Sequence, residues 1–300
     1  MGQGSGVTDD ASWRGFVHHL HLDKVEGGIY EGSCLPGRLG RIYGGHVVAH
    51  ALVAATSESD RGLSPLSLHL HFLQAGDCAV RVRYVVTAIR SGRSFEHWQV
   101  VASQGEAVIA SAVVVLHRPE PSPSHTTHNP DDSDPDELPV EISFQRLGLR
   151  SVVRTGFDIR RGLTWQADEA PAPPYQNMWF RCVDEIPDDP ITHAAVLAWA
   201  SDLELTWTAD LPYREGFHGR QATSLDHVIY FHQPIDMTRW WLHRQTSPAY
   251  DDARALSLGE IYSRDGDLAA SVSQRSLLRF TGIPDEDLGA PPVVPADGAS

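Results

Sequence analysis

The second half of this sequence repeats the plan of its first half. A helix-like stretch at 44–56 is followed by a strand-like stretch at 66–73, and the same order returns at 192–205 and 224–232. Each strand-like stretch is followed by a short segment that should end the strand and that begins with a Gln, at Gln74 in the first half and Gln233 in the second. A duplication of this length is too long for a solenoid repeat and indicates two fused copies of one small domain. Differences between the two copies are therefore the places to look for function.

Composition excludes several classes of protein. The chain has 300 residues, of which 41% are hydrophobic, so it can bury a sizeable core. Its three cysteines are odd in number and scattered, which favours a reduced, cytoplasmic protein over a disulfide or zinc framework. No segment resembles a signal peptide or a membrane span. The net charge of −15 makes nucleic acid an unfavourable partner.

The two copies are separated by a segment rich in Pro, Ser and Asp. We expect a first repeat at 12–118, an exposed linker at 119–140 and a second repeat at 141–282 that carries the active site. The Pro-rich residues 283–300 are predicted to form a disordered tail.

The strand-like segments of the first half show the alternation of an antiparallel sheet. Apolar side chains alternate with Ser67, His69 and His71 along 66–73, as in a strand with one buried face. Three further strand candidates follow, at 80–90, 94–103 and 107–117. The predicted fold class is α+β, with an antiparallel sheet wrapped around one central helix in each repeat.

Three polar residues of the second half are candidates for catalysis. Asp202 lies in a helix-like stretch that is apolar on nearly all sides, where a carboxylate is costly unless it is hydrogen-bonded or functional. Ser224 begins a predicted strand, and Gln274 lies among apolar residues of another, at 268–278. Taken singly, each also fits a structural role: a helix cap, a strand-start hydroxyl and an exposed strand position.

The comparison between the copies favours a functional role. With an offset of 159–160 residues, Ser224 corresponds to Pro65 and Gln274 to Val114, so the first copy has no polar side chain at either place. If these residues served only to solvate a sheet face, some polarity would be expected in both copies. We therefore expect one active site in each fused pair.

Several short motifs of this chain occur together, in the order and spacing of a known family. They are Leu22–Tyr30, Tyr43–Val48, Phe72–Asp77, Arg93–Phe95, Ala200–Leu203, Asp226-His227 with Phe231-His232, Gly259–Tyr262 and Ala270–Gln274. Through these motifs the sequence resembles the acyl-CoA thioesterase II family, and the resemblance extends from about Leu20 to Arg279. The resemblance implies a double hotdog fold, a homo-oligomer and an acyl-CoA or acyl-carrier thioester substrate, and it requires no metal or organic cofactor.

The resemblance also implies roles for the three polar residues. In that family an Asp, a Thr or Ser, and a Gln activate a water that attacks the thioester, and the matching positions are Asp202, Ser224 and Gln274. A thioester carbonyl is electrophilic, so the water needs a base and an orientation rather than a covalent nucleophile. The chain contains no G-x-S-x-G motif of a serine hydrolase.

Two other reactions or roles stay open on the same fold. One is altered acyl-thioester chemistry, such as a hydratase, a dehydratase or biosynthetic acyl processing, although the D-x-N-x-x-H motif of such hydratases is absent. The other is acyl-CoA binding without catalysis.

The chain departs from the family at the start of its first helix. We expect Gly44, Gly45, His46 and His50 to contact the substrate, since a helix N-terminus presents backbone N–H groups. Family members carry Gln at the two His positions. His46 and His50 share one helix face, so they offer half of a metal site, with His69 and His71 in the next strand as further ligands. The simpler interpretation is that they replace Gln as hydrogen-bonding groups, with no metal.

Overall fold

The computed structural model describes residues 15–35, 40–129, 133–140, 156–161, 172–213 and 220–280. The predicted tail at 283–300 lies outside these residues.

Within the described residues, thirteen strands form a single antiparallel sheet that contains two copies of the same strand order. In the first repeat the order from the outside inward is β2 (Ile29–Gly32), β4 (Val82–Ser91), β5 (Phe95–Gln104), β6 (Ala107–His117) and β3 (Ser64–Phe72). In the second repeat it is β8 (Tyr175–Cys182), β11 (Trp241–Asp251), β12 (Arg254–Ser263), β13 (Leu268–Phe280) and β10 (Asp226–Phe231). Outer strands β1 (Asp23–Glu26) and β7 (Phe157–Arg161) extend the two edges, and β9 (Arg220–Ser224) pairs with one end of β13.

The two repeats join at the middle of the sheet. Strands β3 and β10 pair antiparallel there, with Leu68 opposite Ile229. The predicted antiparallel sheet of the first half is confirmed, since β3 buries Leu68 and Leu70 and exposes His69 and His71.

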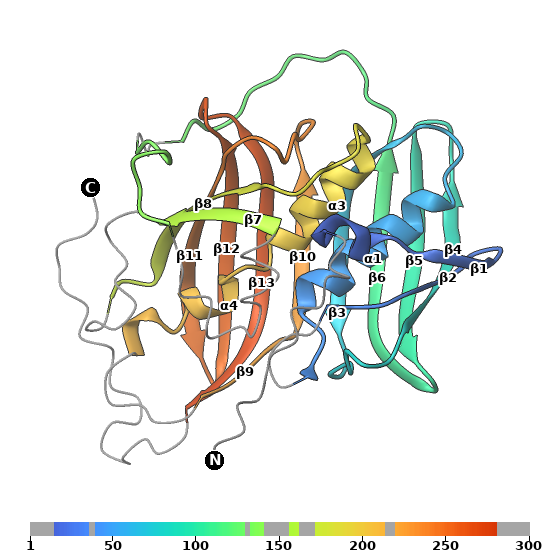
Figure 1. The fold of residues 1–300 in the computed structure, drawn as a ribbon, viewed down its shortest axis with the longest axis horizontal. Helices are drawn as coiled ribbons and strands as arrows, with labels where there is room; N and C mark the ends of the chain where they lie inside the picture. The colour runs from blue at the N-terminus through green and yellow to red at the C-terminus, as the bar shows by residue number, and fades with distance from the viewer. Residues whose placement is uncertain are drawn as a thin grey trace, which may run out of the picture.

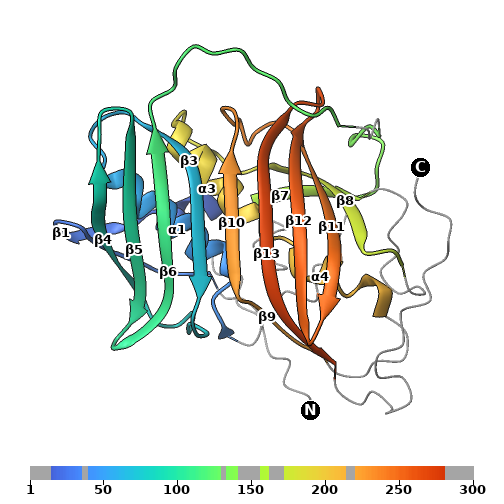
Figure 2. The same cartoon turned by 180° about the vertical axis from the view of Figure 1, so that it is seen from behind.

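The helices α1 (Gly44–Ser57) and α3 (Pro190–Ala200) lie side by side on one face of this sheet (Figure 1). Seen from behind, the opposite face of the sheet has no helix over it among the described residues (Figure 2). Both helices are almost wholly buried and belong to one apolar core that spans the two repeats. The backbones approach closely, because a Cβ added at Gly45 would lie 2.3 Å from the carbonyl oxygen of Trp199. This arrangement confirms the double hotdog architecture.

The helix of the second repeat is shorter than the sequence predicts. It begins after the Asp189 cap and ends at Ala200, so Asp202 lies in the turn that follows the helix and not inside it. Glu204 has a left-handed backbone with φ of 61°, and the short helix α4 (Leu205–Thr208) begins after it. The side chain of Gln245 donates to the carbonyl of Leu203 at 2.8 Å and stabilises the turn. A long-range contact therefore holds the turn that follows the helix.

Ser224 also lies in a different context from the predicted one. It is the last residue of β9, and Leu225 separates it from β10. The break is stabilised on both sides, since the Leu225 N–H donates to the carbonyl of Arg275 and its carbonyl accepts from Phe72. Ser224 is thereby held opposite Ser276 of β13.

The segment that follows β6 crosses from the first repeat to the second (Figure 1). It is exposed along 119–128, and the Asn129 N–H then donates to the carbonyl of Gly266. Further on, Arg264 forms ion pairs with Asp134 and Asp136. The connection is thus attached to the turn between β12 and β13.

Among the described residues, no helix has the length and apolar character needed to cross a membrane.

Candidate active site

Asp202 is a buried carboxylate at the junction of the two repeats. It is 8% exposed, and its Oδ2 accepts a hydrogen bond of 2.8 Å from the N–H of Gly45, at the start of α1. Burial raises the pKa of Asp202 to about 7, although hydrogen bonds from Gly45 and the Gln274 side chain oppose the shift. A carboxylate with such a pKa can accept a proton near neutral pH.

Gln274 lies beside Asp202 and is fixed by a chain of buried side chains. Its Nε2 donates to Thr206 Oγ1 at 2.8 Å, and its Oε1 lies 2.6 Å from Nδ1 of His227. The other ring nitrogen of His227 is 2.8 Å from the hydroxyl of Ser201. Burial lowers the pKa of His227 to about 4, so the ring is neutral. The network then assigns the proton to Nδ1, which donates to Gln274, while Nε2 and the carbonyl oxygen of Ala198, 2.9 Å from the Ser201 hydroxyl, compete for the single proton of that hydroxyl.

A cavity of about 540 Å³ brings the candidate residues together. Asp202 and Ser224 both line it, as does Thr206, which links Gln274 to the cavity wall. Much of the remaining wall is apolar and includes Ile42, Tyr43, Val47, Phe72, Ile109, Trp207 and Leu225. An apolar cavity with a few convergent polar groups is typical of a small-molecule site. Its composition suits an acyl chain that ends beside a carboxylate.

Gly44 and Gly45 lie where the cavity meets the N-terminus of α1. Gly44 lines the cavity, and a Cβ added there would lie 2.9 Å from Oδ2 of Asp202. Gly45 donates its N–H to that carboxylate. Two adjacent glycines thus allow the helix to approach both Asp202 and α3.

His46 and His50, in contrast, lie outside the cavity lining. Both side chains are completely buried, and their Nε2 atoms are 3.0 and 2.9 Å from the carbonyl oxygen of His19. The expected substrate contacts of these two residues thus have no counterpart in the cavity lining. His69 and His71 do not join them, because both are exposed on β3.

The first repeat has no equivalent of the Gln274 network. Leu68 and Val114 correspond to His227 and Gln274 by the same offset of 159–160, and they pair across β3 and β6 as a buried apolar couple. The polar pair is therefore confined to one repeat, as the comparison of the copies suggested for Gln274.

The sequence alone assigned no role to three residues of this network, Ser201, Thr206 and His227. His227 belongs to a motif shared with the family. The first repeat has Leu68 at the equivalent position, so the comparison of the copies could have indicated a special role for His227. Nothing local marks Thr206, since its contact with Gln274 joins residues 68 positions apart.

The fold and the cavity define a double hotdog protein of the thioesterase class. A family model described as acyl-CoA thioesterase matches residues 167–277, and one described as acyl-CoA thioesterase N-terminal domain matches residues 35–117. The acyl-CoA thioesterase 2 of Haemophilus influenzae is 30% identical over 277 residues, covering 88% of this chain and 97% of that protein. The acyl-coenzyme A thioesterase 8 of Mus musculus is 31% identical, covering 87% of this chain and 88% of that protein.

Solved structures agree. The crystal structure of the acyl-CoA thioesterase II TesB2 from Mycobacterium marinum has a TM-score of 0.76 and 32% identity, covering 89% of this chain and 99% of that one. A hot dog fold protein from Alicyclobacillus acidocaldarius has a TM-score of 0.74 at 21% identity, covering 87% of this chain and 96% of that one, and shows the fold alone. The chain belongs to the acyl-CoA thioesterase II family, and the predicted class of enzyme, a thioester hydrolase, is confirmed.

Proposed function

We propose that this protein hydrolyses acyl-CoA thioesters to a free acid and CoA, with one active site in the second repeat formed by Asp202, Ser224 and Gln274. The observation that carries the proposal is the buried Asp202, which lines the apolar cavity with a pKa raised to about 7. The relatives named above, which are called acyl-CoA thioesterases, support the choice of substrate.

In this proposal Asp202 is the general base. One carboxylate oxygen is occupied by the N–H of Gly45, so the other is assigned to the water. Gln274 donates a hydrogen bond toward Asp202, and the Ser224 hydroxyl orients the water from the cavity wall. The water adds to the thioester carbonyl as Asp202 takes its proton, and the tetrahedral intermediate then expels the CoA thiolate, which is protonated on release.

The oxyanion that forms during attack needs hydrogen-bond donors. The N-terminus of α1 reaches the cavity at Gly44, and the positive end of the helix dipole points there. We assign the stabilisation of the oxyanion to this helix end.

Three finer points belong to the same proposal. The substrate is a CoA thioester rather than a carrier-protein thioester, because the supporting relatives are named for CoA. The repeats extend over 12–118 and 141–282, with 119–140 connecting them. The protein acts in the cytoplasm, as its scattered cysteines suggest, and it does so as a homo-oligomer, as the family resemblance implies.

The test is thiol release from short, medium and long acyl-CoAs by the wild type and by Asp202→Asn. Asn keeps the shape and the acceptor for Gly45 but cannot act as a base, so release is expected to fall by about 10²–10⁴-fold. Glu204→Gln is the matched control, since Glu204 is a buried carboxylate two residues away that does not line the cavity. Full activity of Asp202→Asn would refute the mechanism, and inactivity of the wild type on every acyl-CoA would refute the substrate.

A further inference from the structure

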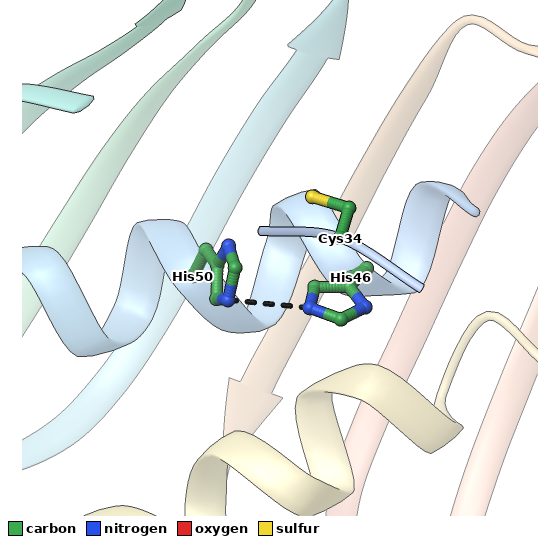
Figure 3. Close-up of side chains that lie close together, drawn as sticks. All are labelled: Cys34, His46 and His50. Atoms are coloured by element: carbon green, nitrogen blue, oxygen red, sulfur yellow. Dashed lines mark hydrogen bonds between the residues drawn. The ribbon is translucent and has the colours of Figure 1, made fainter. Parts of the chain in front are cut away.

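Cys34, His46 and His50 form a second buried polar cluster, which the proposed reaction does not use. Cys34 follows β2, and the two histidines project from successive turns of α1 (Figure 3). His46 and His50 are fully buried and Cys34 is 7% exposed. One ligand atom from each lies within 4.8 Å of the others. The sequence offered the two histidines as half of a metal site, and the fold supplies a thiol as a third donor.

The distances in this cluster match the dimensions of a coordination sphere. The Nε2 atoms of His46 and His50 are 3.2 Å apart, and both are about equally far from the His19 carbonyl oxygen, at 3.0 and 2.9 Å. In a tetrahedral zinc site with bonds of about 2.0–2.1 Å to nitrogen, neighbouring donors lie about 3.3 Å apart. The two imidazole nitrogens and the His19 carbonyl oxygen therefore need to move by only a few tenths of an ångström, whereas the Cys34 sulfur, within 4.8 Å of the nitrogens, needs to move inward by up to about 1 Å.

We infer that Cys34, His46 and His50 bind a Zn²⁺-type metal ion, with the His19 carbonyl oxygen as a fourth, weaker donor. Two imidazoles and a thiolate suit zinc better than magnesium or calcium, which prefer oxygen ligands. The site is closed, since its residues are buried and none lines the active-site cavity. Its role is accordingly structural: it fastens the segment that follows β2 to α1.

Binding has a cost at the thiol of this buried cluster. Burial raises the pKa of Cys34 to about 12, so the metal ion must displace the thiol proton when it binds. The His50 ring has room because its Cε1 would lie 2.8 Å from a Cβ at position 32, which is a glycine.

Tyr84 allows the hydrogen bonds to reverse when the metal binds. Its hydroxyl is 3.0 Å from Nδ1 of His50 and also hydrogen-bonds the thiol of Cys34. Without metal, the thiol donates to Tyr84, Tyr84 donates to His50, and both Nε2–H groups donate to the His19 carbonyl. With metal, each imidazole carries its proton on Nδ1, His50 donates to Tyr84, and Tyr84 donates to the thiolate.

The balance of this exchange is one metal ion bound and one thiol proton released. Metal binding also removes one hydrogen bond of His46. Without metal, its Nδ1 accepts a long hydrogen bond of 3.5 Å from the Leu35 N–H. That bond is lost when Nδ1 carries a proton. It is long enough to contribute little.

The experiment is metal reconstitution of the full chain without an affinity tag. The protein is stripped with a chelator, given one equivalent of Zn²⁺ or Co²⁺, desalted, and assayed for metal by mass spectrometry. We expect about one ion per chain, and a thiolate-to-cobalt charge-transfer band in the near ultraviolet. Cys34→Ser and the double variant His46→Gln/His50→Gln should each retain less than about a tenth of that amount.

The control is His18→Gln/His21→Gln, which removes two exposed histidines near the cluster and should leave the metal content unchanged. Folding of each variant is checked by circular dichroism. The inference is overturned if folded wild type retains less than about a tenth of an ion, or if it binds cobalt without the thiolate band. It is also overturned if the folded variants retain as much metal as the wild type. The cluster would then only connect α1 to neighbouring segments through hydrogen bonds. None of these readouts depends on thioesterase activity.

Discussion

Nδ1 of His227 lies 2.6 Å from Oε1 of Gln274, and this buried polar pair occupies the place that Leu68 and Val114 hold in the first repeat. Burying two polar side chains is costly unless each satisfies the other. In the second repeat the two polar side chains are buried and satisfy each other, and the Gln274 amide is thereby directed toward Asp202. We therefore interpret His227 as a positioning residue for Gln274.

Replacing His227 with Leu, the residue of the first repeat, should leave Gln274 without its partner. The unfolding free energy is expected to fall by about 1–3 kcal/mol, because a buried amide oxygen loses its donor. Thiol release should fall mainly in kcat, since the amide no longer points at the reacting water. Urea denaturation and steady-state kinetics measure the two effects.

The double variant His227→Leu/Gln274→Val is the matched control, because it recreates the apolar pair of the first repeat. Its stability should return toward the wild-type value while its activity stays low. If His227→Leu alone kept full kcat, the positioning role would be wrong.

The pH profile of the wild type should report the base. The pKa of Asp202 is raised to about 7 by burial, so the proton acceptor is present above that pH and absent below it. We expect kcat/KM to rise with pH up to about 7 and then level off. A profile that levels off near the ordinary pKa of an aspartate would assign the base elsewhere.

The stability of Asp202→Asn relative to the wild type should depend on pH. The pKa of Asp202 is about 7 in the folded state and 3.8 ordinarily, so the folded state binds the proton more tightly than the unfolded state does. This difference stabilises the fold fully below pH 3.8, and the stabilisation is lost as the pH rises to about 7. At 1.36 kcal/mol per pKa unit, the variant should gain about 4 kcal/mol relative to the wild type by about pH 8. Denaturation curves at about pH 4 and pH 8 test this, and an equal stability difference at both would contradict the shifted pKa.

Ser224 should contribute through its hydroxyl. Ser224→Ala is expected to lower kcat about tenfold, the value of one neutral hydrogen bond of about 1.4 kcal/mol, with little change in KM. Ser224→Thr keeps the hydroxyl and should retain most of the activity. The role of Ser224 fails if the Ala variant is as active as the Thr variant.

Gly45 should be intolerant of any side chain. A Cβ there would meet the Trp199 carbonyl at 2.3 Å, so Gly45→Ala must separate α1 from α3 and should destabilise the protein by about 2–4 kcal/mol. Gly27→Ala is the control, because nothing lies within 4 Å of a Cβ at that position. Thermal denaturation of both variants measures the difference, and equal melting temperatures would contradict the close packing.

The architecture was predictable because its signals are local. Alternating polarity along 66–73 indicated a half-buried strand, and the repetition of helix and strand indicated two copies. Gln274 stands out because it lies among apolar residues of a predicted strand and because the other copy has Val114 at the equivalent position.

The rest depends on contacts between distant residues. The sequence Ala200–Leu205 is compatible with a helix, but α3 ends at Ala200, and the turn after it is held by Gln245, some 40 positions away, which donates to the carbonyl of Leu203. Cys34 is only 12 positions from His46, but it lies outside the helix that carries both histidines, so no local periodicity predicts its place beside them.

The central claim is that Asp202 acts as a base on water and not as a nucleophile, and a single turnover in ¹⁸O-labelled water tests it most directly. With enzyme in excess over acyl-CoA, direct attack by water predicts one ¹⁸O atom in the released acid and none in the peptide that contains Asp202. Label in that peptide, or an acyl group attached to Asp202 or Ser224, would contradict the account.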